Sequence, residues 1–226
     1  FLLLNNLKNE NTMEKLKPTL KNMTLVLVGV AVVVGFVLAY VNHITQKPIE
    51  EKAKVTLAQG IKDVMKVNDL KVTADDTVKS SVNGKELAFV VHKTADKNGN
   101  DLGAAVESTT TGFGGDLKVL VGFDKDGKIS GYTILESSET PGLGAKADKW
   151  FQSTNDGGKG GKSCVIGLSP KEGELKVSKD GGQVDAITAS TITSRAFLKA
   201  INEAYSAYAK NGADCTSSAS KQNKKG

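Results

Sequence analysis

The chain has 226 residues, of which 39% are hydrophobic, so it can form one domain of ordinary core size and a further apolar segment. Its formal net charge is +5, but the 30 basic residues include a single arginine and are mixed with 25 acidic residues. Aromatic residues make up only 5% and no basic patch alternates with them, so we expect no nucleic acid partner.

The first predicted element is a membrane-spanning helix. Residues 22–42 (NMTLVLVGVAVVVGFVLAYVN) carry no charged side chain, and a helix of that length spans about 30 Å, the thickness of a bilayer core. The apolar core of a cleavable signal peptide is shorter and is followed by small residues, whereas residues 39–42 (AYVN) form a poor cleavage site. We therefore predict an uncleaved, single-pass anchor in the cell membrane.

The order of elements predicts one large domain after this anchor, on the outer side of the membrane. Lysines flank the span on both sides, so the positive-inside bias is slight, and a short N-terminus inside with a large domain outside is the simplest topology. The predicted segments are a cytoplasmic N-terminus (1–21), the transmembrane helix (22–42), a membrane-proximal helix with a connecting segment (43–85), the main extracytoplasmic domain (86–212) and a disordered tail (213–226).

The main domain is predicted to be α+β. Apolar residues from Ile49 to Met65 recur on one helical face, which favours a helix leaving the membrane. A final amphipathic helix is expected from Thr193 to Lys210, with Gly212 just past its end. Between the helices, four β-like runs are separated by turn residues, and the last two flank a hairpin turn at 124–128. The runs are Leu87–His92, Ala104–Ser108, Leu117–Phe123 and Ile129–Leu135.

Common catalytic motifs are missing from the sequence. It contains no GxSxG motif, no dinucleotide-binding glycine pattern and no P-loop, and the glycines of residues 112–115 precede a strand and predict a turn. Cys164 and Cys215 have no metal-site spacing, so no metal is expected, and both a disulfide and two free thiols fit the sequence. Redox chemistry would therefore need a bound cofactor.

The most informative segment is a cluster of hydroxyl side chains, residues 188–194 (TASTITS), directly before the last helix. Capping of the helix explains one such hydroxyl. A helix start with small residues also suits an anion such as a phosphate. Arg195, four residues after Thr191, could donate two hydrogen bonds to phosphate oxygens.

This segment (DAITASTITSRA) resembles the flavinylation motif of FMN-binding domains, in which the final threonine carries FMN through a phosphodiester bond. On this chain that residue is Thr191, preceded by Asp185, Thr188, Ala189 and Ser190. The family commonly has Gly-Ala where this chain has Ala-Ser at 189–190. We expect Thr193 and Arg195 to complete this part of the site.

A second segment strengthens the resemblance. Residues 112–115 (GFGG), followed by LKVLVGFDKDGKISGYTILESSETPGLGAK, are similar to the G subunit of Rnf complexes and to the C subunit of the Na⁺-translocating NADH:quinone reductase. In those relatives the ETPGLG loop lies beside the flavin. The resemblance therefore adds five cofactor-binding residues: Glu139, Thr140, Gly142, Leu143 and Gly144.

The resemblance implies a covalent-FMN electron carrier in an Rnf-type complex, which couples electron transfer between ferredoxin and NAD⁺ to ion pumping. Its implied partners are the other membrane and redox subunits, and a flavin transferase that uses FAD and a divalent metal. The alternatives are the C subunit of the Na⁺-translocating reductase, a free-standing membrane-anchored extracytoplasmic flavoprotein, and a structural subunit without flavin. The electron-carrier subunit of an Rnf-type complex is the interpretation we favour.

Overall fold

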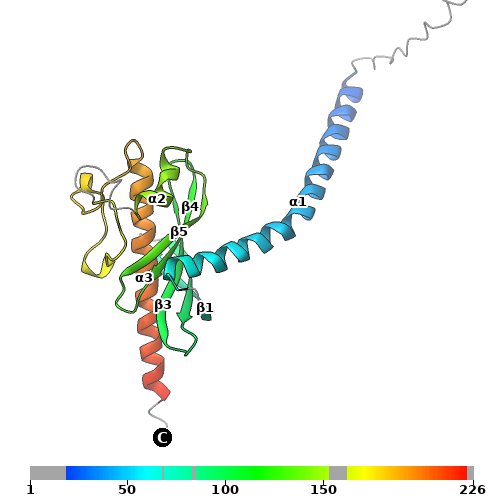
Figure 1. The fold of residues 1–226 in the computed structure, drawn as a ribbon. Helices are drawn as coiled ribbons and strands as arrows, with labels where there is room; N and C mark the ends of the chain where they lie inside the picture. Colours follow the sequence, from blue (N-terminus) through cyan, green and yellow to red (C-terminus); the bar gives the residue numbers. More distant parts are fainter. Residues whose placement is uncertain (1–18, 68, 83–84, 153–161, 223–226) are drawn as a thin grey trace, which may run out of the picture. The chain divides into compact units, whose positions relative to one another are not determined.

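The computed structural model describes residues 19–67, 69–82, 85–152 and 162–222, and its contacts divide into one unit up to Ala53 and a second from Lys54 (Figure 1). Helix α1 (Leu20–Met65) begins in the first unit. An 18-residue window of this helix has a mean hydropathy of 2.7 and is not buried at all. It is the one helix among the described residues that is long and apolar enough to cross a membrane, as predicted for residues 22–42.

The second unit is built on a five-stranded sheet in which every strand pairs antiparallel with the next one along the chain. Tight turns produce this order: between β4 and β5, the Asp124 carboxylate accepts hydrogen bonds from the backbone N–H groups of Asp126 and Lys128. The strands are β1 (Lys71–Val82), β2 (Lys85–Ala95), β3 (Asp101–Thr111), β4 (Asp116–Phe123) and β5 (Ile129–Ser137).

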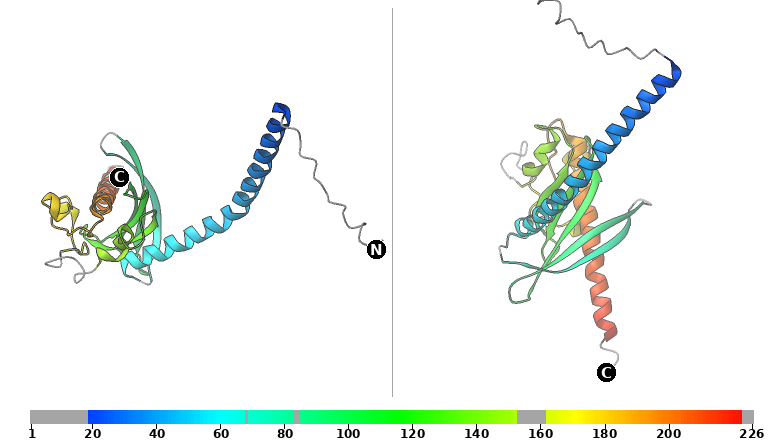
Figure 2. Two further views of the ribbon diagram at one scale, coloured as in Figure 1. Left: turned by 90° about the horizontal axis from the view of Figure 1, so that it is seen from above. Right: turned by 90° about the vertical axis from the view of Figure 1, so that its right-hand side faces the viewer.

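Helix α3 (Thr191–Gln222) lies along one face of this sheet (Figure 2). Phe197 and Ile201 of this helix are fully buried among strand residues. The Phe197 ring stacks on Phe151 at 4.4 Å and meets the edge of Tyr132 at 4.7 Å. The described part of the chain between β5 and α3 forms four short helices: η1 (Gly144–Lys146), α2 (Ala147–Trp150), η2 (Pro170–Glu172) and η3 (Ser178–Asp180).

The other face of the sheet receives the last turns of α1. Ile61, Val64 and Met65 are buried against Ala105 and Leu120. Two glycines that pair across β4 and β5, at 122 and 131, make this contact possible. A Cβ atom at either position would lie 2.8 or 2.6 Å from the carbonyl oxygen of Val64, closer than real Cβ atoms come.

The structure confirms the α+β class, the four predicted strands, the hairpin at 124–128 and the helix that ends at Met65. Strand β1 was missed because its sequence (KVTADDTVKSSV) is largely polar, as an edge strand can be. The predicted boundary between 85 and 86 therefore falls inside the β1–β2 hairpin. Residues 152–163 (QSTNDGGKGGKS), whose glycines predict a loop from the sequence, lie mostly outside the described residues.

The predicted end of the last helix at Gly212 is wrong, because α3 starts at Thr191 and continues to Gln222. Glycine ends a helix only where the chain adopts a left-handed turn, and inside a helix it costs about 1 kcal/mol. The segment predicted as a disordered tail, 213–226, therefore begins within α3.

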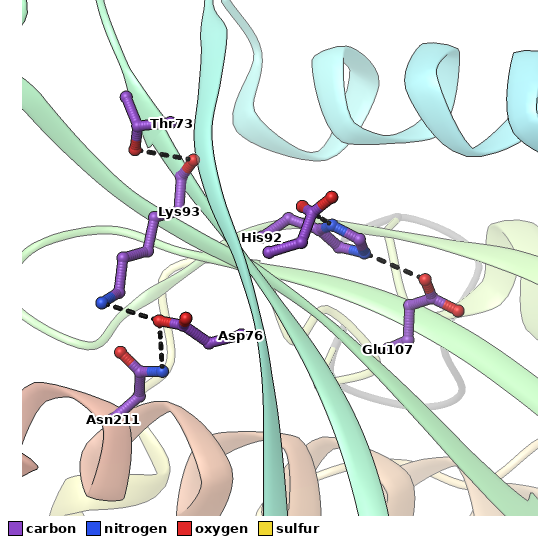
Figure 3. Close-up of polar contacts among 7 residues, drawn as sticks. Thr73, Asp76, His92, Lys93, Glu107 and Asn211 are labelled. Atoms are coloured by element: carbon purple, nitrogen blue, oxygen red, sulfur yellow. Dashed lines mark hydrogen bonds and ion pairs between the residues drawn. The ribbon is translucent and has the colours of Figure 1, made fainter.

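A partly buried cluster of charged side chains joins β1, β2 and β3 on the α1 side of the sheet (Figure 3). The His92 ring is only 4% exposed, and its nitrogens lie 2.7 Å from the Asp75 carboxylate and 2.9 Å from Glu107. Lys118 pairs with the other Glu107 oxygen at 2.7 Å. On the opposite face, Asp76 accepts hydrogen bonds from Lys93 and from Asn211 of α3.

The pKa values in this cluster shift in opposite directions. Burial favours neutral His92, but its hydrogen bonds to Glu107 and Asp75 outweigh burial and raise its pKa above 6.5. Burial would likewise raise the pKa of Glu107, but the bonds from His92 and Lys118 lower it below 4.5. The cluster thus stabilises the fold most between about pH 4.5 and 6.5.

We predict that His92→Gln lowers the free energy of unfolding by about 1–3 kcal/mol near pH 5.5, the usual worth of charged hydrogen bonds. The loss should shrink as the pH rises through the folded-state pKa of His92, because the imidazolium contribution disappears there. Urea unfolding followed by the fluorescence of Trp150, the only tryptophan, measures it. His43→Gln is the matched control, and an equal loss at pH 5.5 and 8.5 would contradict the assignment.

Candidate functional site

The start of α3 is shaped by a network of serine hydrogen bonds. Ser194 is fully buried. Its backbone N–H and its hydroxyl both donate to the carbonyl oxygen of Ser190, at 3.0 and 2.9 Å, and the hydroxyl accepts the N–H of Ile187 at 3.0 Å. These bonds close the first turn, so Thr191 is the first residue of the helix. One member of the hydroxyl cluster, Ser194, is thus structural, because its hydroxyl ties the segment before the helix to the first turn.

Ala189 adopts a left-handed backbone conformation directly before this turn, with φ of +63°. An L-residue with a Cβ atom pays roughly 1–2 kcal/mol for that conformation, whereas glycine does not. The left-handed backbone at this place therefore explains why the resembled motif commonly has glycine there. Ala189 adopts this conformation despite its Cβ atom.

A buried carboxylate forms the opposite wall. Glu139 follows β5, is 7% exposed, and accepts the backbone N–H of Phe113 at 2.7 Å. That bond ties the predicted turn at 112–115, confirmed between β3 and β4, to the end of β5. Residues 140–143 form a second turn, in which the N–H of Leu143 reaches the Thr140 carbonyl at 3.1 Å.

These walls enclose a hollow of about 320 Å³, within the range usual for small-molecule sites. Three of its apolar side chains are largely exposed: Phe113, Leu143 and Ile192. Eight of the predicted site residues line it, and they come from two segments about fifty residues apart. They are Glu139, Thr140, Leu143, Gly144, Ala189, Ser190, Thr191 and Thr193.

Exposure separates Thr191 from the neighbouring hydroxyls. Ser190 and Thr193 also line the hollow, but they are only 8% and 1% exposed. Thr188 is exposed but does not line it. Thr191 is partly exposed, lines the hollow and stands at the helix start, where N–H groups face outward and the helix dipole favours an anion.

Four predicted site residues do not line the hollow. Gly142 occupies the 140–143 turn with φ of +78° and no atom within 4 Å of its Cβ position. Thr188 is exposed to solvent. Asp185 accepts a hydrogen bond from the Ser178 hydroxyl at 2.8 Å. Its backbone carbonyl accepts the Trp150 indole N–H at 3.0 Å.

The fourth of these residues, Arg195, forms a bidentate ion pair. Its Nε and Nη2 atoms each lie 2.7 Å from an oxygen of Asp180. The hydrogen bonds raise the pKa of Arg195 and lower that of Asp180. In this structure the two donors expected to face a phosphate therefore face a carboxylate, and phosphate binding by Arg195 stays a prediction.

Sequence reasoning missed three side chains at the site. Phe113 lay within the quoted glycine segment, but only the β3–β4 turn brings it to the hollow. Ile192 has the sequence signal of an ordinary helix residue. Lys179 has no local sequence signal, yet its Nζ atom donates to the Thr191 hydroxyl at 3.4 Å.

A larger hollow of about 540 Å³ lies where α3 passes the β2–β3 hairpin, lined by Val91, Ala104 and Tyr208 among others. It shares no residue with the hollow at Thr191. Cys164 carries a free thiol, and the side chain of Cys215 falls outside the described residues.

Together, the sheet, the helix packed on it and the hollow at the first turn of that helix define a ligand-binding α+β domain that follows a helix able to cross a membrane. Residues 112–206 match the family model of the FMN-binding domain. The chain is 30% identical over 197 residues to the G subunit of the ion-translocating oxidoreductase complex of Shewanella piezotolerans, covering 82% of this chain and 87% of that protein.

It is 34% identical over 193 residues to the G subunit of the Na⁺-translocating ferredoxin:NAD⁺ oxidoreductase complex of Acetobacterium woodii, covering 81% of this chain and 89% of that protein. A shorter match, 38% identical over 125 residues, covers 54% of this chain and 56% of the corresponding G subunit of Aliivibrio fischeri. The chain belongs to the family of G subunits of ion-translocating oxidoreductase complexes.

We predict that Gly144→Ala destabilises the domain by about 1–3 kcal/mol, the usual cost of overpacking. The new Cβ atom would lie 2.8 Å from the Thr193 hydroxyl and would collide with the Glu139 carboxylate, which is held by Phe113. Urea unfolding measures the loss. Gly142→Asn is the matched control, because that site is open and asparagine tolerates its left-handed backbone. Equal losses in the two variants would contradict the packing of Gly144 against Glu139.

Proposed function

We propose that this chain carries FMN as the electron-transfer subunit of an Rnf-type complex, which couples ferredoxin:NAD⁺ oxidoreduction to ion translocation. The similarity to G subunits over most of the length supports this assignment rather than the C subunit of the Na⁺-translocating reductase or a free-standing flavoprotein. The FMN-binding domain match supports an electron carrier over a subunit without flavin. Bound FMN supplies one- and two-electron transfer, which no side chain of the hollow can provide.

We further propose that Thr191 bears the FMN through its phosphate. The observation that carries this assignment is that Thr191 combines an accessible hydroxyl in the hollow with a place at the first turn of α3, whereas the other accessible hydroxyl, that of Thr140, lies in the facing loop. Attachment from FAD by a flavin transferase would form a P–O bond to Thr191 Oγ and break the P–O bond to AMP, which leaves, while the hydroxyl proton is released. Outside the cell a covalent tether keeps the local flavin concentration independent of dilution.

The residues of the hollow suit the two ends of FMN. The outward N–H groups of residues 191–193 would receive the phosphate. Phe113, Leu143 and Ile192 offer apolar surface for the flat ring. The buried carboxylate of Glu139 is bonded to the Phe113 N–H, so it shapes this wall. Ala189, Ser190 and Thr193 keep the helix start open to the phosphate, and Thr140, Gly142 and Gly144 form the loop beside the ring.

The domain is proposed to lie outside the cytoplasm, with α1 as its single anchor beside the other subunits. The support is the order of elements, with one candidate span before the whole sheet domain. Protease added outside intact spheroplasts should digest the domain, and protection there would place it inside.

The attachment site makes a direct prediction. Thr191→Ala should abolish the flavin fluorescence that stays with the denatured polypeptide, and peptide mass mapping of the native chain should place the adduct on Thr191. Thr188→Ala is the matched control, since Thr188 is exposed but does not line the hollow, and should keep normal fluorescence. Persistent covalent fluorescence in Thr191→Ala would refute the assignment.

We propose that the transferase recognises the negative charge of Asp185. Thr188 belongs to the same loop and is proposed to be part of the recognised segment. Asp185→Asn can still accept the Ser178 hydrogen bond, so the fold should be kept while flavinylation slows roughly tenfold, as expected for one lost charged hydrogen bond. The initial rate of flavin incorporation into purified chain measures this. A normal rate in Asp185→Asn would show that the charge is not recognised.

A further inference from the structure

We propose that Lys179 is the cation that binds the phosphate on Thr191, and that the short helix η3 serves to hold it there. This inference rests on the proposed attachment of FMN to Thr191. It assigns the phosphate charge partner to a loop that precedes the attachment motif.

Three consecutive side chains of η3 each contact the segment around Thr191. Ser178 donates to Asp185 at 2.8 Å, Lys179 donates to Thr191 at 3.4 Å, and Asp180 accepts both bonds from Arg195 at 2.7 Å. The first and third contacts fix the two ends of η3. Lys179 between them is therefore aimed at the Thr191 hydroxyl by its neighbours.

The backbone around η3 is also tied down. Val177 and Val184 form a parallel β-bridge, with the N–H of Ser178 donating to the Val184 carbonyl at 2.7 Å and the N–H of Val184 donating to Lys176 at 3.1 Å. Gly181 closes the turn in the left-handed conformation. A loop held this way keeps the Lys179 backbone in place, so that only the side chain has to adjust to a ligand.

The distance suits a phosphodiester. Attachment of FMN keeps Thr191 Oγ as a bridging oxygen bonded to the phosphorus. The charged non-bridging oxygens of the phosphate are bonded to that phosphorus, so they lie two bonds from Oγ. An ammonium 3.4 Å from Thr191 Oγ can therefore reach a charged oxygen by rotation about its own side-chain bonds. The charge-assisted bond formed in this way is stronger than the present contact to a neutral hydroxyl.

Two neighbouring cations have partners of their own. Arg195 is engaged by Asp180 through Nε and Nη2, along one edge of its planar group. Lys176 pairs with Glu174 at 3.0 Å. Lys179 is the cationic side chain whose contact is with Thr191 itself. The phosphate contact expected of Arg195 from the sequence is thus assigned to Lys179, and Arg195 is a positioning residue that holds η3 through Asp180.

The test compares melting temperatures in a cycle of four proteins: the native chain, Lys179→Met, Thr191→Ala and the double variant. All are full-length and produced with the transferase, and the extent of flavinylation is measured for each. In the flavinylated background Lys179→Met should lower the melting temperature by about 1–4 °C, as one exposed charge pair does in a chain of this size. In the Thr191→Ala background, which has no phosphate, the same change should have no effect.

The control is Lys171→Met, which removes an equal charge from the neighbouring helix η2 and should leave the melting temperature unchanged. The Lys179 effect should also vanish in 1 M salt, where charges are screened within about 3 Å. If Lys179→Met blocks flavinylation, restoration by Lys179→Arg supports the charge requirement, and failure of arginine to restore it overturns the proposal.

Equal melting temperatures of native and Lys179→Met chains, both flavinylated on Thr191, would overturn the role of Lys179 and leave the proposed function standing. A native chain that takes up no flavin on Thr191 would instead refute the proposed function, and this inference with it.

Discussion

The site depends on one buried hydroxyl, that of Ser194. It donates to Ser190 and accepts from Ile187, so it fixes the turn before α3 and the place where the helix begins. Once the helix starts at Thr191, the helical period decides which way each neighbouring side chain faces: Thr193 and Ser194 turn into the protein, and Thr191 faces the hollow. A row of similar residues thus acquires different roles from one set of hydrogen bonds.

The sheet brings the second wall to the same place. The β3–β4 turn and the end of β5 lie at one end of the sheet, and Thr110 donates to the Ala196 carbonyl at 3.1 Å, which holds the start of α3 beside the end of β3. Phe113, Glu139 and Thr191 therefore line the same hollow although they are distant in sequence. The last turns of α1 pack on the opposite face of the sheet, against Ala105 and Leu120. The sheet can thus be packed against α1 without obstructing the hollow.

Much of this arrangement was predictable, and the exceptions have physical reasons. Apolar runs and turn residues identified β2 to β5, since buried strands must be apolar. The mostly polar β1 gives no such signal, because it pairs at the sheet edge. The motif indicated Thr191 and its neighbours, but Phe113 and Lys179 reach the site only through tertiary contacts. Arg195 was expected at the phosphate because it lies four residues after Thr191. That spacing could not reveal that Asp180, fifteen residues earlier, binds the guanidinium instead.

The hollow beside Thr191 is proposed to receive a flavin tethered to that residue. An experimental structure of the flavinylated full-length protein tests it most directly. We expect continuous density from Thr191 Oγ through a phosphate at the first turn of α3, with the flat ring against Phe113, Leu143 and Ile192. Density for the flavin on another residue, or a ring lying away from this hollow with its lining side chains unchanged, would contradict it.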